Sequence, residues 1–161
     1  GVFQLIMGLS VLQLHFNPYQ LGAFYIFGHV FLYLSIAYYS RIPTHIWRPD
    51  WEIPVFGINL LAGAGITLIN IVKWNQPVIK HGVIIWNVPM PVGPLIGLLV
   101  VANFIFGGLI FFSKLALDRS GVERYKLLLI ALGLTLMSIA GPIHDNTTSL
   151  KMLAAADVLT T

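Results

Sequence analysis

The sequence has no cysteine and few charged residues. The absence of cysteine excludes disulfide bonds, thiolate metal ligands and cysteine nucleophiles. Charged residues make up 9% of the 161 residues, whereas an ordinary soluble domain has about 25%. So few polar side chains cannot cover the surface of a water-soluble globule of this size. The hydrophobic content of 57% and the mean hydropathy of +0.84 agree, and the composition therefore predicts a membrane protein.

The motifs of soluble enzymes are also missing. The sequence contains no GxxxxGK phosphate loop, no HExxH zinc motif and no GxSxG nucleophile turn. Its nine basic residues outnumber six acidic ones, but they lie in short connections and form no continuous basic face, which argues against nucleic-acid binding. We expect a protein that is not catalytic on its own.

Long apolar runs fill the sequence and predict transmembrane helices. About 20 apolar residues span a bilayer as a helix, and these runs lack the alternation of barrel strands. We therefore expect one all-α domain over residues 1–161, a polytopic integral membrane helical bundle of about six segments. The predicted segments are 2–15, 19–40, 53–72, 92–115, 125–143 and one that begins near 150. The first and the last are too short to span, so we expect both to be incomplete.

The four tryptophans support this threading, because tryptophan prefers the boundary between hydrocarbon and water. They lie in the connections after the second and third segments, as Trp47, Trp51, Trp74 and Trp86. The later connection should hold a small β-hairpin, because residues 78–79 and 83–85 are apolar strand formers around Lys80-His81-Gly82. So apolar a loop should lie on the membrane interface or against a partner.

Lysine and arginine are unevenly distributed between the two predicted sides of the membrane. Three lie on one side, and six lie in the connections after the second and fourth segments, namely Arg41, Arg48, Lys114, Arg119, Arg124 and Lys126. Cytoplasmic connections carry an excess of these residues, so we expect the turn 119–126 to be cytoplasmic. The predicted location is the plasma membrane or another energy-converting membrane, crossed several times.

His29 is the candidate cofactor ligand. It falls at the centre of the second segment, where an ionisable group is costly and suggests function. Three interpretations remain open. The imidazole is neutral and bonded to a neighbouring helix, through Asn59, Asn70 or Asn103; it ligates a haem or a chlorophyll-type pigment, with Gly28 admitting a flat ring; or it relays protons. A bis-histidine haem is disfavoured, because the other histidines map to helix ends or loops.

Small and amide residues mark the expected helix contacts. Gly93 and Gly97 have GxxxG spacing, and Gly63 lies in a run of small residues in the third segment. Such residues let helix backbones approach closely, and amides such as Asn59 and Asn103 hydrogen-bond between helices. No carboxylate lies well inside a predicted span, which argues against an ion-coupled transporter.

Arg124-Tyr125-Lys126 begins the fifth segment after a charged turn. In this feature and in the order of its helices the chain resembles the membrane input region of some prokaryotic histidine kinases, a resemblance that covers no catalytic residue and assigns no family. We expect an accessory subunit of a larger energy-converting or oxidoreductase-type membrane complex, in contact with the lipid bilayer, bound lipids and other membrane subunits. A sensor input module is the alternative, and a small transporter or channel ranks third.

The charge distribution yields a test of orientation. In this cysteine-free chain, a cysteine that replaces Gly82 should react with an impermeant thiol reagent in intact cells. A cysteine that replaces Gly121 should react only after the membrane is permeabilised. Labelling of position 121 from outside, without labelling of position 82, would overturn the orientation.

Overall fold

The computed structural model describes residues 5–6, 17–80, 83–146, 149, 151–152 and 155. In this part of the chain, four helices are long and apolar enough to cross a membrane, over Tyr19–Trp47, Pro49–Val72, Val92–Leu117 and Gly121–Ile143. The predicted all-α, multi-span membrane architecture is therefore confirmed with four spans. The expected first and sixth segments lie almost entirely outside the described residues.

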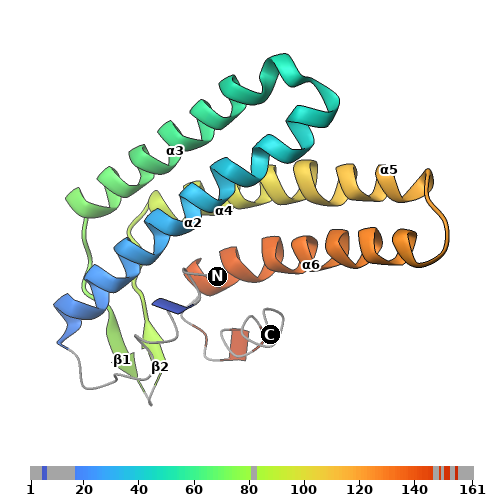
Figure 1. Cartoon of the computed structure of the whole chain (residues 1–161). Coiled ribbons are helices and arrows are strands. Elements are labelled where there is room, and N and C mark those ends of the chain that lie inside the picture. The colour runs from blue at the N-terminus through green and yellow to red at the C-terminus, as the bar shows by residue number, and fades with distance from the viewer. Residues whose placement is uncertain are drawn as a thin grey trace.

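The first hairpin of helices consists of α2 (Pro18–Trp47) and α3 (Glu52–Val72), joined by the short 3-10 helix η1 (Pro49–Trp51) (Figure 1). A capping box starts α2, because the Asn17 side chain accepts from the Tyr19 N–H at 3.1 Å and the Gln20 side chain accepts from the Asn17 N–H at 3.3 Å. The predicted end of this helix at Ser40 is wrong. The helix continues to Trp47 and includes Pro43.

The second hairpin pairs one long helix of mixed pitch with α6 (Gly121–Asn146) (Figure 1). The long helix contains α4 (Val92–Val101), the π-helix η2 (Ala102–Ile110) and α5 (Phe111–Leu117). Helix α6 starts at Gly121 with a φ of 58°, a left-handed conformation that glycine adopts without strain. The neighbouring Ser120 is therefore the better cysteine position for the orientation test.

A two-stranded β-hairpin connects the two pairs of helices. Strand β1 (Val78–Lys80) pairs antiparallel with β2 (Val83–Ile85), and Ile79 lies opposite Ile84. The predicted β-hairpin is confirmed, although its turn residues 81–82 lie outside the described residues. The end of this connection packs on α2, where the buried residues are Leu21, Tyr25, Ile84 and Trp86. This end of the loop is therefore covered by its own chain, whereas Val78 and Ile79 of β1 remain exposed.

The two helical hairpins meet along an interface that we call the seam, formed mainly by α2 with η2 and by α3 with α4. The seam has fewer residue contacts than the interface between the helices of either hairpin. The main hydrophobic core lies at this seam and draws on α2, α3, α4 and η2. Its buried members are Tyr33, Ile36, Ile66, Val92, Ile96, Val100 and Phe104.

Glycines permit the closest helix contacts. A Cβ atom on Gly63 would lie 2.5 Å from the Cβ atom of Tyr33, so α2 and α3 meet there through bare backbone. A Cβ atom on Gly97 would lie 3.4 Å from the Cβ atom of Pro142, which places Gly97 against α6. Gly93 is buried in the first turn of α4. These three glycines are among the five residues that the sequence assigned to helix packing, and each lies in a packed region.

The contact at Gly63 predicts a sharp difference between two glycines of α3. Gly63→Ala should lower the free energy of unfolding by about 1–3 kcal/mol, because the added methyl overlaps the Tyr33 side chain close to its backbone. Gly65→Ala is the matched control, since no described atom outside the neighbouring backbone of α3 lies within 4 Å of its added methyl. It should be neutral or slightly stabilising. Thermal unfolding in detergent measures both, and equal midpoints would contradict the contact.

Candidate functional site

His29 lies in a packed aromatic environment on α2. Its side chain is 2% exposed, and its Nδ1 atom lies 2.9 Å from the backbone carbonyl oxygen of Tyr25. A carbonyl oxygen only accepts, so Nδ1 carries the proton and donates. The ring centroids of Tyr25 and Tyr33 lie 4.0 Å and 5.9 Å from that of His29. Tyr25 also contacts Trp86, which follows the β-hairpin. His29, one turn after Tyr25, therefore lies nearer to the β-hairpin end of α2 than to the end at Trp47.

His29 is packed against Tyr25 and Tyr33, and its role as a cofactor ligand stays a prediction. Among the described residues, no group of three His, Cys, Asp or Glu side chains is placed to hold a metal ion. The two cavities reported below do not include His29 in their walls. A haem or chlorophyll-type pigment on His29 stays a prediction, and neither of these cavities would hold it there.

Asn59 and Asn103 bond to each other across the seam. The Nδ2 atom of Asn59 donates to Oδ1 of Asn103 at 3.0 Å, and Nδ2 of Asn103 donates to Oδ1 of Asn59 at 2.8 Å. Asn103 also donates to the backbone carbonyl of Leu99 at 2.9 Å. This amide pair joins α3 of the first hairpin to the π-helix of the second.

A cavity of about 640 Å³ opens beside the amide pair, and we call it the seam cavity. It lies between the last turns of α2, the start of α3 and the π-helix, and its wall includes Ser40, Pro43, Trp47, Asn103 and Phe106. Its volume is in the range of small-molecule sites, about 300–1,000 Å³. A second cavity of about 350 Å³ lies between α2 and α3, beside Gly63.

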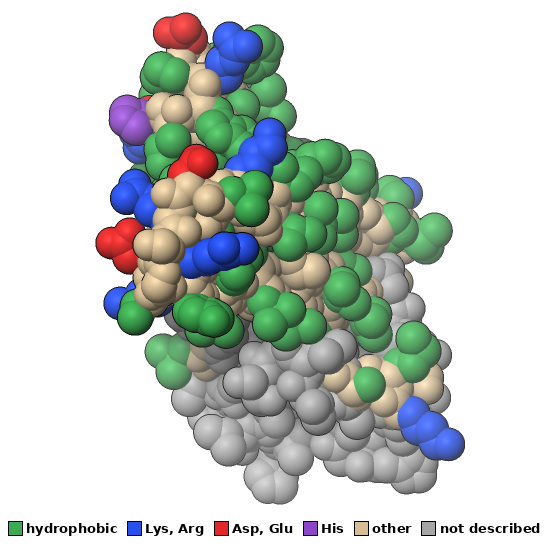
Figure 2. Space-filling model, turned by 90° about the vertical axis from the view of Figure 1, so that its right-hand side faces the viewer, with side chains coloured by type: hydrophobic (Ala, Val, Ile, Leu, Met, Phe, Trp, Pro, Cys, Tyr) green, Lys and Arg blue, Asp and Glu red, His purple; other side chains and the backbone are tan. Residues whose placement is uncertain are grey.

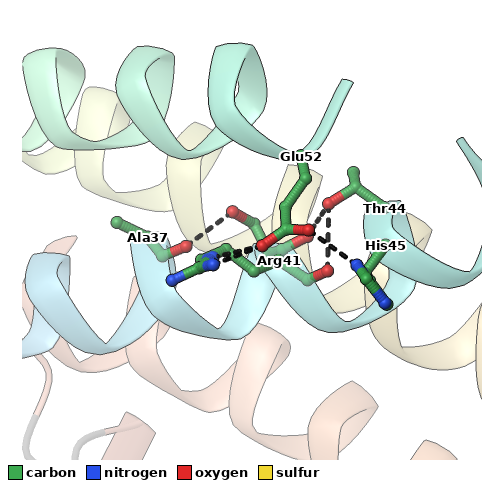
Figure 3. Close-up of polar contacts among 6 residues, drawn as sticks. Ala37, Arg41, Thr44, His45 and Glu52 are labelled. Atoms are coloured by element: carbon green, nitrogen blue, oxygen red, sulfur yellow. Dashed lines mark hydrogen bonds and ion pairs between the residues drawn. The ribbon is translucent and has the colours of Figure 1, made fainter. Parts of the chain in front are cut away.

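Glu52 fastens the connection that forms one side of the seam cavity. The Nε atom of Arg41 donates to its Oε1 at 2.6 Å, and the Nδ1 atom of His45 lies 2.7 Å from its Oε2. Figure 3 shows both side chains of α2 converging on the carboxylate of α3. Arg41 also lies over the Phe56 ring, 5.8 Å from its centroid. We call Glu52, Arg41 and His45 the Glu52 clamp. It holds α2 against α3 where the chain reverses direction.

Two cations lie at or near the seam cavity, Arg48 in its wall and Lys114 beside the lining residue Trp47. Arg48 lines the cavity, and the Nζ atom of Lys114 lies 5.6 Å from the ring centroid of Trp47. In the described part of the chain, neither cation forms an ion pair, whereas Arg119 pairs with Glu123 at 3.7 Å. Figure 2 looks onto this end of the molecule, where Lys and Arg side chains lie among a few acidic ones.

Sequence reasoning missed the seam cavity and the Glu52 clamp. The cavity forms only where α2, the start of α3 and the π-helix meet. No local sequence pattern predicts the π-helix. The clamp had a weaker signal, because Arg41 and His45 are four residues apart and so share one face of α2. That signal was obscured by the expectation that α2 ends at Ser40.

The chain matches no protein-family model, no curated protein and no solved structure. Its functional assignment therefore rests on its residues and their geometry. In plain terms, it is a multi-span helical membrane protein.

The amide pair predicts energetic coupling between Asn59 and Asn103. Asn59→Leu and Asn103→Leu should each lower the free energy of unfolding by about 1 kcal/mol, because each leaves the other amide without its partner. The double variant should lose less than the sum of the two, by about 0.6–1.7 kcal/mol. Unfolding in mixed micelles measures all three, with the exposed Asn75→Leu as control. Strict additivity would show that the two amides act independently.

Proposed function

We propose that the chain is a non-catalytic subunit of a larger membrane assembly and acts by holding other membrane helices. The observation that supports this most directly is the open face of α6. Only 17% of the 18 residues in its apolar stretch are buried. Among the described residues, and apart from the glycine's chain neighbours and the nearby backbone of α6 itself, no atom lies within 4 Å of the position that a Cβ would take on Gly133 or Gly141.

Open glycines favour a helix rather than lipid alone as the neighbour of α6. Glycine costs about 1 kcal/mol relative to alanine in a helix, and a purely lipid-facing position gains nothing from it. Gly133 lies among the exposed side chains of Leu129, Ile130 and Leu132, so it leaves a notch in an apolar surface. Small residues of this kind let a second transmembrane helix approach closely.

The distribution of charge is consistent with this role. Of the described acidic side chains outside the first hairpin's clamp, Asp50 lies in η1, Asp118 follows α5 and Glu123 lies in the first turn of α6, so all three are at the ends of spans. The spans therefore present apolar surface to their surroundings, and any chemistry of the assembly would be carried by other subunits. The energy-converting or oxidoreductase character of that assembly remains part of the proposal.

A sensor input module is the second candidate, and the seam cavity favours it. Its wall combines α2 and α3 of one hairpin with the π-helix of the other. A ligand in the cavity would touch both hairpins, and a ligand that binds one arrangement of them better than another shifts the population toward it. A cytoplasmic signalling domain in a longer form of the chain would favour this candidate over the subunit.

The open face of α6 generates a test of association. Gly133→Leu should weaken co-purification of partner membrane proteins about tenfold, because the side chain fills the notch and costs the contact about 1–3 kcal/mol. The chain's own thermal midpoint should not fall, since no described atom outside the nearby backbone of α6 lies within 4 Å of the new Cβ and leucine is the better helix former. Leu129→Ile, on the same exposed face, is the control. Equal recovery of partners with Gly133→Leu and with the control would refute the docking role of this face.

A further inference from the structure

The seam cavity has an apolar interior and a cationic mouth, and we propose that it binds one acyl chain of an anionic amphiphile. The ligand class is a phospholipid or fatty acid whose negative head lies at Arg48 and Lys114. This proposal goes beyond helix packing and does not depend on it, because the cavity belongs to a single chain.

The interior of the cavity calls for a hydrocarbon, because its polar groups are already bonded within the protein. The Ser40 hydroxyl donates to the Ala37 carbonyl at 2.7 Å, and the Thr44 hydroxyl donates to the Ser40 carbonyl at 2.6 Å. The Asn103 amide is engaged by Asn59 and by the Leu99 carbonyl. A ligand segment in this space therefore needs no hydrogen bonds, and burial of its apolar surface is what it gains.

The shape of the cavity suits a chain that enters from the basic end. Along α2 its wall runs from Arg48 back to Ser40, about 12 Å at ~1.5 Å per residue. A Cβ on Gly107 would lie 3.3 Å from the Cγ atom of Pro43, so the π-helix and α2 touch and close one side. The space between them accommodates part of one acyl chain.

The mouth of the cavity favours a negative headgroup. Arg48 and Lys114 carry no ion pair within the described residues, so their charges are available to a ligand. The two nearby carboxylates do not neutralise these cations. Glu52 is bonded to Arg41 and His45, and Asp50 forms no ion pair with a described residue. The rings of Trp47 and Trp51 line the same cavity, and tryptophan is typical of the headgroup level of a bilayer.

Quenching of tryptophan fluorescence by brominated acyl chains tests the proposal. The purified chain is placed in phosphatidylcholine vesicles that contain a small fraction of one brominated probe: phosphatidylglycerol, stearic acid or phosphatidylcholine. Each cation near a membrane surface contributes about fivefold to the apparent affinity for an anionic lipid. At least one anionic probe should therefore quench at several-fold lower mole fraction than the neutral one, and the two anionic arms identify the source of the head.

Variants locate the quenching in the seam cavity. Trp47→Phe together with Trp51→Phe should abolish the selective component, because both rings line the cavity. Arg48→Gln should reduce the preference for the anionic probe about fivefold and leave the neutral probe unaffected. Ala102→Leu should narrow the cavity and weaken the selective quenching, whereas the exposed neighbour Val101→Leu should not.

Two outcomes would overturn the proposal. One is equal quenching by all three probes at equal mole fraction in the wild-type protein. The other is unchanged anionic preference in Arg48→Gln, an exposed position where the substitution does not disturb the core. Because these measurements use a single chain in vesicles, failure of the partner-docking role of α6 would leave their result intact.

Discussion

Inside a bilayer, helices attract each other by close van der Waals contact, since lipid tails are as apolar as leucine side chains. In this chain glycine supplies that closeness at each main contact. Gly63 packs against Tyr33 of α2, and Gly97 packs against Pro142 of α6. An added Cβ on Gly108 would lie 2.8 Å from the Cδ1 atom of Leu134 in α6. These contacts set the distances between the helices within each hairpin. The seam between the two hairpins holds the main hydrophobic core instead.

Of about six predicted segments, the described residues show four as spans, which the sequence predicted because hydrophobic length is a strong local signal. It also predicted the β-hairpin from the apolar runs around Lys80-His81-Gly82. It placed the end of α2 too early, because Arg41 and Pro43 resembled a stop, whereas the helix absorbs the proline and continues to Trp47. That error also put His29 at the centre of its span. The π-helix has no recognisable sequence pattern, and the seam cavity arises only when three segments meet.

Within the described residues, the helices of the first hairpin are joined to each other more firmly than the two hairpins are joined across the seam. The helices α2 and α3 are in extensive contact and are clamped where they turn by Glu52 with Arg41 and His45. Contacts across the seam are fewer, and the π-helix, a form often found at functional sites, lies on that side. The more weakly joined boundary therefore coincides with the cavity, on which the sensor candidate depends.

The amide pair of Asn59 and Asn103 gives this boundary a further property. Neither side chain gains or loses a proton in the physiological range, and neither carries a net charge. A change in pH leaves the bonds intact, and the transmembrane voltage, which acts on net charge, exerts no pull on them. The hydrogen bonds of this amide pair are therefore insensitive to acidity and to membrane potential.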